Sequence, residues 1–299
     1  MCVNINIVIV GTAPGDETAL GHEAAGVVTK VAQGVTGLSV GDRVVVFDKG
    51  CFANRIHTKP ARAHRIPNSM TFDEAATIST AYITAIHSLL DHASLSVGKR
   101  VLIHSAAGGI GIAAIQIAQS VGAEVYVTVS THEKREFLKA AFGLVDDRIF
   151  HSRNTEFGDQ ILSATNGRGV DVILNPLSGD ILDESFRVLT DGGIMVELGK
   201  RDVLDRSSLP SAPFDRNSSF KAVDLSPETA TDSLVARLMS KLFELIEGGS
   251  IKPIEPVHKF SWTDIPAAFQ FMRPGTHIGK VVLTQNSEVK VPVSFSDII

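Results

Sequence analysis

The chain has 299 residues, of which 44% are hydrophobic and 20% are charged, and its formal net charge is −5. The composition is that of a globular protein with a sizeable core, and the length suggests two domains. A negative net charge without a stripe of Lys and Arg argues against a nucleic-acid-binding protein. The apolar run at 5–10 lacks a preceding basic segment and is shorter than the about 18 residues of a membrane span, so we expect neither a signal peptide nor a membrane protein. The chain has only two cysteines, Cys2 and Cys51, so we do not expect a disulfide framework. We expect a reducing, cytoplasmic location instead.

Residues 24–47 are the first predicted element, and they indicate β structure. A Gly41-Asp42 turn precedes the apolar run Val44-Val45-Val46, which is typical of a strand that follows a tight turn. Residues 71–93 are predicted to be helical, because Thr71 can cap the first turn, acidic residues follow it, and apolar residues continue the segment.

From residue 100 the chain alternates between strand-like and helix-like segments. The predicted strands span residues 100–104, 124–129, 148–150, 170–174, 193–198 and 219–223. The predicted helices span residues 110–121, 132–141, 155–165 and 180–189. Such alternation predicts a parallel, doubly wound sheet. Further along, the sequence predicts a loop at 201–218, a long amphipathic helix at 230–247, a strand at 279–284 and no clear element after residue 285.

β-rich sequence flanks the alternating region on both sides. This order predicts an α/β protein in which a Rossmann domain is inserted into a second, β-rich domain. The expected nucleotide-binding domain spans residues 81–249, and the expected outer domain combines residues 1–80 with residues 250–299.

The most informative stretch is 101–111, in which an apolar run leads into small residues and then into an apolar helix. These are the parts of a dinucleotide-binding crossover, where the backbone approaches a pyrophosphate and the helix N-terminus faces its charge. Against G-x-G-x-x-G, alanine replaces the first glycine, and the flanking strand and helix supply the context that the motif requires. The alternative is a packed loop without a ligand. The predicted cofactor-binding residues are Ala106, Gly108, Gly109, Ile110 and Gly111.

The residues after the second strand of this region favour NADPH over NADH. The acid that would hold the ribose hydroxyls of NAD is expected about 20 residues past the glycines. The strand at 124–129 is instead followed by Ser130, with Lys134 and Arg135 beyond it. A carboxylate would repel a 2′-phosphate, whereas a hydroxyl and cations attract it. The alternative is that Lys134 and Arg135 are exposed helix charges.

Several motifs carry a family resemblance. They are Gly21-x-Glu23-x-x-Gly26, Gly41-Asp42-Arg43-Val44, Ile149-Phe150-x-Ser152-Arg153, Gly167-x-Gly169-Val170-Asp171-Val172, Leu177-Ser178-Gly179, Glu197-x-Gly199-Lys200-x-Asp202 and Ile278-Gly279-Lys280. Together they resemble the medium-chain dehydrogenase/reductase superfamily and, more narrowly, the enoyl reductase domain of fungal-type reducing polyketide synthases and fatty acid synthases. The resemblance covers about residues 11–285, and it implies a Rossmann sheet inserted in a GroES-like domain.

In such enzymes NADPH gives a hydride to the β-carbon of an α,β-unsaturated thioester on an acyl carrier protein, and the α-carbon then takes a proton. Negative charge develops on the thioester oxygen, so preorganised donors beside it lower the barrier. The resemblance implies that Lys200 and Asp224 are catalytic. The further residues that it places at the cofactor are Thr84, Arg153, Asn175 and Gly199. The plainer interpretations are exposed charges after strands for Lys200 and Asp224, and an Asx turn before Pro176 for Asn175.

The sequence departs from the family near its start. The family usually carries an Asn-Phe-Arg/Lys-Asp motif near the substrate, and the comparable stretch here is Val3-Asn4-Ile5-Asn6-Ile7. We therefore expect an N-terminally shortened outer domain with an unpaired sheet edge, around an active site whose completeness is open. His22 stands where related alcohol dehydrogenases have a zinc ligand, but zinc needs three protein ligands and no upstream cysteine has the required spacing, so no metal is expected.

The expected function is NADPH-dependent reduction of α,β-unsaturated acyl thioesters. The expected partners are an acyl carrier protein and other polyketide synthase domains, without nucleic acid or membrane. A zinc-free quinone oxidoreductase is the alternative enzyme. The alternative of another class is a catalytically impaired NADPH-binding remnant or structural module, which the shortened start motivates.

Overall fold

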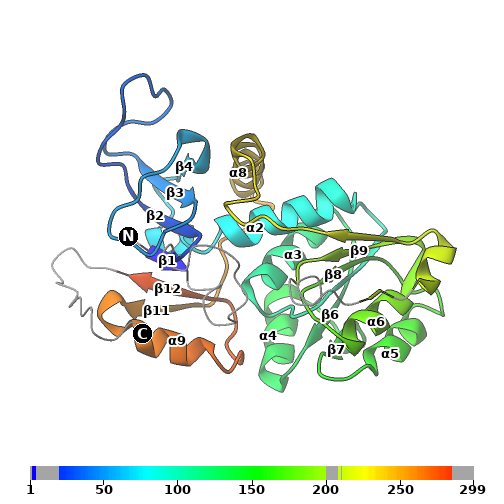
Figure 1. Cartoon of the computed structure of the whole chain (residues 1–299). Coiled ribbons are helices and arrows are strands. Elements are labelled where there is room, and N and C mark those ends of the chain that lie inside the picture. The colour runs from blue at the N-terminus through cyan, green and yellow to red at the C-terminus, as the bar shows by residue number, and fades with distance from the viewer. Residues whose placement is uncertain (1, 5–19, 200–207, 210, 285–299) are drawn as a thin grey trace. The chain divides into compact units, whose positions relative to one another are not determined.

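The computed structural model describes residues 2–4, 20–199, 208–209 and 211–284. It divides the chain into two compact units, which are treated separately below (Figure 1). One unit combines Met1–Ser79 with Glu255–Ile299, and the other is Thr80–Ile254. Within the described ranges, no helix is long and apolar enough to cross a membrane.

The unit Thr80–Ile254 contains a six-stranded parallel sheet in the order β10-β9-β8-β5-β6-β7. Its strands are β5 (Arg100–Ile103), β6 (Glu124–Val129), β7 (Ile149–His151), β8 (Val170–Asn175), β9 (Leu189–Glu197) and β10 (Ser219–Ala222). Numbered from β5 and viewed from β7, the order is 3-2-1-4-5-6, which is that of a doubly wound dinucleotide-binding sheet. The predicted fold class is confirmed, and each predicted strand of this region is present.

Helices cover both faces of this sheet, α3 and α4 on one side and α5 and α6 on the other (Figure 1). The helices of the unit are α2 (Ser79–Ile86), α3 (Gly109–Ser120), α4 (His132–Phe142), α5 (Phe157–Ala164), α6 (Asp180–Arg187) and α8 (Asp232–Glu247). Local sequence sets their ends: Thr131 caps α4 by accepting a hydrogen bond from the Lys134 N–H, and Gly143, with φ 66°, ends it in the left-handed region. Short 3₁₀ turns are η4 (Asp146–Arg148) and η5 (Ala212–Arg216).

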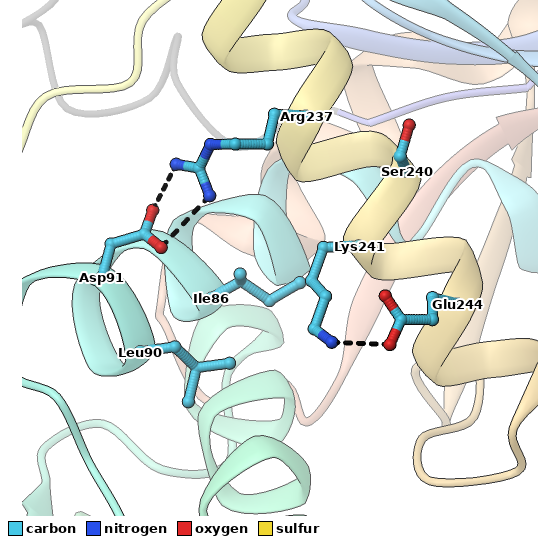
Figure 2. Close-up of a pocket in the computed structure, with 7 residues that line it drawn as sticks. All are labelled: Ile86, Leu90, Asp91, Arg237, Ser240, Lys241 and Glu244. Carbon is cyan, nitrogen blue, oxygen red and sulfur yellow. Dashed lines mark hydrogen bonds and ion pairs between the residues drawn. The ribbon is translucent and has the colours of Figure 1, made fainter.

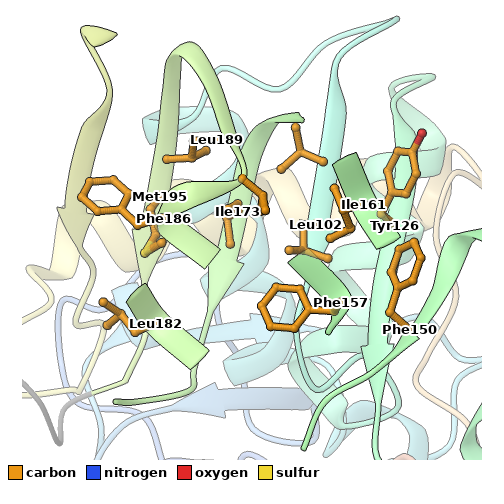
Figure 3. Packing of buried hydrophobic residues seen from close by; sticks show 12 residues of the cluster. Leu102, Tyr126, Phe150, Phe157, Ile161, Ile173, Leu182, Phe186, Leu189 and Met195 are labelled. Atoms are coloured by element: carbon orange, nitrogen blue, oxygen red, sulfur yellow. The ribbon is translucent and has the colours of Figure 1, made fainter. Parts of the chain in front are cut away.

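The core beside the sheet is a cluster of large apolar side chains (Figure 3). Leu102 of β5 and Ile173 of β8 pack with Phe157 of α5 and Phe186 of α6, and all four side chains are buried. Tyr126 of β6 stacks on Phe150 of β7 with ring centroids 6.3 Å apart. Fully burying one such side chain contributes roughly 1.5–3 kcal/mol, so this cluster fixes the strands whose ends carry the site.

The other unit contains a six-stranded sheet in the order β11-β12-β1-β2-β3-β4. Its strands are β1 (Cys2–Asn4), β2 (Glu23–Val27), β3 (Arg43–Phe47), β4 (Ala63–Arg65), β11 (Val257–Ser261) and β12 (Lys280–Thr284). Strand β1 pairs antiparallel with both β12 and β2. The expected unpaired edge is therefore wrong at this position, because Cys2–Asn4 pairs on both sides.

Several elements outside the parallel sheet differ from the prediction. The predicted helix 71–93 is interrupted and forms α1 (Phe72–Ala75), α2 and a π-helical turn, η3 (His87–His92). Thr71 caps it as expected: its hydroxyl oxygen accepts from the Glu74 N–H, and the Glu74 carboxylate accepts from the Thr71 N–H. The 3₁₀ turns η2 (Pro60–Arg62) and η6 (Trp262–Asp264), strands β4 and β11, and helix α9 (Ile265–Met272) were not predicted. Pro266 lies in the first turn of α9, where proline is tolerated.

Candidate functional site

The loop between β5 and α3 is fixed on the sheet by its own backbone. The Ala106 N–H donates to the Thr128 carbonyl of β6 at 3.1 Å, and the Gly108 N–H donates to the Ser105 carbonyl at 3.0 Å. The Ile112 N–H then donates to the Gly108 carbonyl at 2.9 Å, which begins the helical ladder. The N–H groups before Ile112 belong to the first turn of α3 and point out of its N-terminus, where they favour an anion.

Gly111 allows this helix to lie directly against the loop. A Cβ at Gly111 would lie 2.5 Å from the Ala106 Cα and 2.6 Å from its carbonyl carbon. Because that contact is with backbone, no side chain can be added without moving the loop or the helix. A Cβ at Gly108 would meet only the Ser105 carbonyl, at 3.4 Å. The third glycine of the pattern therefore has the close-packing role that a dinucleotide-binding turn requires.

Lys134, predicted to bind the 2′-phosphate, and Arg153, which the resemblance places at the cofactor, lie close enough to interact electrostatically. Ser130 follows β6 directly, and Arg153 lies two residues beyond β7, the neighbouring strand. Partial burial lowers the pKa of Lys134, and the positive charge of Arg153 lowers it further. In the described part of the chain, Arg153 forms no ion pair with a carboxylate. Two cations that repel each other at the carboxyl ends of parallel strands are suited to a bound phosphate.

Arg135 has a different role from its neighbour Lys134. Its guanidinium contacts the Asp146 carboxylate at 3.0 Å and also donates to the Ile149 carbonyl at the start of β7. These contacts attach α4 to the sheet. The structure therefore favours the interpretation of Arg135 as a helix charge over that of a phosphate-binding residue.

Asn175 and Glu197 form a buried pair where β8 and β9 end. The two residues face each other across the strands, and their side chains are 0% and 2% exposed. The Asn175 Nδ2 donates to the Glu197 Oε2 at 2.6 Å, and the Gly199 N–H donates to the Glu197 Oε1 at 2.5 Å. The Leu177 N–H donates to the Asn175 Oδ1 at 3.3 Å, so Asn175 also forms the Asx turn.

Glu197 belongs to the motif Glu197-x-Gly199-Lys200-x-Asp202, but no role is predicted for it from the sequence. The signal that identifies it is an acidic residue directly after the apolar run 194–196, at the end of β9. A buried carboxylate needs hydrogen-bond donors, and the side chain of Asn175 and the backbone of Gly199 provide them here.

The remaining predicted residues lie apart from these contacts. Asp224 is exposed beyond β10, and its carboxylate accepts a hydrogen bond from the Ser226 N–H at 2.8 Å, as in an Asx turn. Thr84 is 9% exposed on α2. Lys200 lies outside the described residues.

A pocket of about 540 Å³ lies between α8 and the segment formed by α2 and η3 (Figure 2). Arg237 of α8 donates two hydrogen bonds to the Asp91 carboxylate, which also contacts the His87 Nδ1 at 2.7 Å. The pocket is lined by Ile86, Leu90, Asp91, Arg237, Ser240, Lys241 and Glu244. None of these residues was predicted from sequence, and their charged groups neutralise one another, as Lys241 does with Glu244 at 2.7 Å.

His104 is a core residue rather than a ligand. Its Nδ1 contacts the Thr128 Oγ1 and its Nε2 contacts the Ser185 Oγ, both at 2.8 Å. Because the Ser185 hydroxyl donates to the Ile181 carbonyl, the His104 Nε2 must be the donor to Ser185. Burial lowers the pKa of His104 to about 3 and so keeps it neutral. Among the residues that the structure describes, no group of three His, Cys, Asp or Glu side chains is placed to hold a metal ion.

Family models match both parts of the chain. Residues 4–86 match the alcohol dehydrogenase GroES-like domain, and residues 145–283 match the zinc-binding dehydrogenase model. A highly reducing polyketide synthase from Penicillium crustosum is 48% identical over 288 residues, which is 96% of this chain. The chain spans only 12% of that relative's length.

The chain is also similar to solved structures. The CurK enoyl reductase superimposes with a TM-score of 0.80 and 35% identity, covering 89% of this chain and 79% of that one. A mycobacterial protein, Rv1454c, solved in complex with NADPH, superimposes with a TM-score of 0.83 at 24% identity, covering 95% of this chain and 89% of that one. The second likeness concerns the fold alone.

Proposed function

The chain belongs to the enoyl reductase domains of the medium-chain dehydrogenase/reductase family of oxidoreductases, and we propose that it reduces α,β-unsaturated acyl thioesters with NADPH. The observation that carries the proposal is the arrangement of residues where the strands of the parallel sheet end. There the turn before α3, closed by the contact of Gly111 with Ala106, lies on the same sheet edge as the cations Lys134 and Arg153.

The residues present fit NADPH. The Gly109, Ile110 and Gly111 N–H groups of the first turn of α3 would hold the pyrophosphate. Lys134 and Arg153, with the Ser130 hydroxyl, would hold the 2′-phosphate, and its charge would relieve their mutual repulsion. When bound, NADPH supplies the hydride.

The chain itself would stabilise the charge that forms on the thioester oxygen. An ammonium group is suited to this task because it both donates hydrogen bonds and carries positive charge. We assign this task to Lys200, which follows Gly199 in the sequence. We assign the proton of the α-carbon to the ammonium group of the same lysine, and we retain Asp224, whose carboxylate is exposed beyond β10, as the second proposed catalytic residue.

The substrate would arrive on an acyl carrier protein, and the chain would work beside other polyketide synthase domains. This part of the proposal is supported by the relatives, which are multidomain synthases of which the chain matches about one eighth.

Titration of NADPH fluorescence and oxidation of NADPH with a crotonyl thioester test the proposal. We expect saturable binding and turnover with the thioester. Turnover with quinones alone would instead favour the quinone oxidoreductase, and binding without turnover would favour a non-catalytic module. Lys200→Ala should lower turnover while leaving NADPH affinity unchanged, and an equally active variant would contradict the role of Lys200.

A further inference from the structure

The carboxylate of Glu197 joins three backbone segments at the carboxyl ends of β8 and β9. Its Oε2 accepts from Asn175, the last residue of β8, and its Oε1 accepts from the Gly199 N–H beyond β9. Asn175 in turn donates to the Leu177 carbonyl at 2.7 Å. Both turns that leave these two strands are therefore held by one buried acidic group.

The Glu197 carboxylate lies so close to Gly199 that a side chain at residue 199 would collide with it. A Cβ at Gly199 would lie 2.6 Å from the Glu197 Oε1 and 3.3 Å from the Pro176 carbonyl oxygen. The Leu198 N–H also donates to the Asn175 carbonyl at 2.7 Å, which extends the ladder one residue past the strand. These contacts thus hold the backbone of Leu198 and Gly199 against the end of β8.

This place is the edge of the sheet where doubly wound proteins bind their ligands. The residue that follows Gly199 in the sequence is Lys200, to which the proposed function assigns the developing oxyanion. Burying a carboxylate costs free energy that its hydrogen bonds only offset. A carboxylate at this edge is therefore better explained by placement of the following segment than by stability.

We propose that Glu197 is a positioning residue, which with Asn175 fixes the backbone of Leu198 and Gly199, the two residues that precede Lys200 in the sequence. It acts through Asn175 and Gly199 and does not itself contact the substrate. The inference rests on the proposed function for its catalytic consequence, but not for its structural content.

Glu197→Gln is the variant that tests it, because an amide can keep only one of the two contacts. If its oxygen accepts from Gly199, its NH₂ faces the NH₂ of Asn175, and the flipped amide loses Gly199 instead. We expect amide hydrogen exchange at Leu198 and Gly199 to become at least about tenfold faster, while exchange in the loop 105–111 stays unchanged. Unchanged exchange at both amides would overturn the proposal.

The kinetic readout separates positioning from general destabilisation. We expect kcat with the crotonyl thioester to fall about 10- to 100-fold, with the Kd of NADPH unchanged within about twofold, because small displacements of a reacting group are costly. The matched control is Glu247→Gln, an exposed residue of α8, which should leave kcat and exchange unchanged. An unchanged kcat, or a loss of kcat that only follows a loss of NADPH binding, would overturn the proposal.

A reciprocal variant guards against misfolding of the single one. In Glu197→Gln combined with Asn175→Asp, the glutamine NH₂ donates to the aspartate, which reverses the contact between the two side chains, while the glutamine oxygen still accepts from the Gly199 N–H. The variant loses the donor to the Leu177 carbonyl, so the rescue is partial. We expect protection at Gly199 to recover in part. If the wild type binds NADPH but reduces no thioester, the proposed function fails, and the exchange experiment still decides the role of Glu197.

Discussion

Lys280 and Glu23 form a fully buried ion pair between residues 257 positions apart in the sequence. The Lys280 Nζ lies 2.7 Å from the Glu23 Oε1, and both side chains are 1% exposed. The second carboxylate oxygen of Glu23 accepts from the Ser79 hydroxyl at 2.8 Å. This pair joins strand β2 to strand β12, from opposite ends of the chain, within one sheet unit.

Removal of one member should destabilise the protein strongly. We expect Lys280→Met to lower the free energy of unfolding by about 3–5 kcal/mol, because it leaves a carboxylate buried without its counter-charge. Urea unfolding measures the effect. Lys241→Met, which removes an exposed partner of Glu244, should cost less than about 1 kcal/mol. Similar losses for the two variants would contradict this account.

The two glycines of the nucleotide loop should respond differently to alanine. Gly111→Ala places a methyl group against the Ala106 backbone, so we expect lower stability together with loss of NADPH binding. Gly108→Ala meets only an ordinary contact and has a negative φ of −83°, so we expect stability close to that of the wild type. Thermal unfolding and NADPH fluorescence measure both properties. Equal thermal stability of the two variants would rule out the close-packing role of Gly111.

Lys134 should discriminate between the two nicotinamide cofactors. We expect Lys134→Met to weaken NADPH binding about 10- to 100-fold, the usual value of a charge-assisted hydrogen bond, with NADH binding unchanged. The control is Arg135→Gln. Because the Arg135 side chain contacts Asp146, its replacement should leave the ratio of the NADPH and NADH affinities unchanged. Binding of both cofactors weakened equally by Lys134→Met would argue against a 2′-phosphate site.

The lowered pKa of Lys134 predicts that NADPH affinity depends on pH. Since partial burial and Arg153 lower the pKa of Lys134, the ammonium loses its proton at a lower pH than an ordinary lysine does. NADPH affinity should therefore fall as pH rises through that lowered pKa, and NADH affinity should not. Fluorescence titrations of both cofactors across alkaline pH test this, and parallel curves would contradict it.

His104 should contribute to acid unfolding. Its pKa of about 3 in the folded chain lies below the ordinary 6.5, so the unfolded chain binds a proton first. The stability from the neutral imidazole is present above about pH 6.5 and is lost as pH falls toward 3, by about 1.4 kcal/mol per pH unit. Urea unfolding from pH 7 to pH 4 should show a shallower slope for His104→Asn. An identical slope would exclude His104 as the titrating group.

Local patterns predicted much of the nucleotide-binding unit because its strands and helices are long enough to show their own periodicity. The strand 124–129 coincides with β6, and Thr131 caps α4 as its position suggests. The strands β1 and β4 have three residues each, as β7 does, but unlike β7 they lie outside the regular alternation of strands and helices. They were accordingly missed or, for β1, expected to be absent.

The same distinction applies to the candidate site: local sequence indicates some of its residues, and the folded chain decides which of them are neighbours. The turn 105–111 and the cation Lys134 are evident in the sequence, because a strand, small residues and a helix N-terminus in succession form a local pattern that predicts a phosphate site. That Arg153 lies beside Lys134 while Arg135 turns to Asp146 depends on which strand ends are neighbours in the sheet. No spacing along the chain contains that information.

The sequence by itself determined the fold class, the order of the strands and helices in the parallel-sheet unit, and the small-residue turn at 105–111, since each of these follows from periodicity and residue size over short stretches. Only the tertiary structure decided which polar groups meet. The contact of Glu197 with Asn175 and that of Glu23 with Lys280 each join separate strands, and a buried charge is tolerated only where the folded chain brings it a partner.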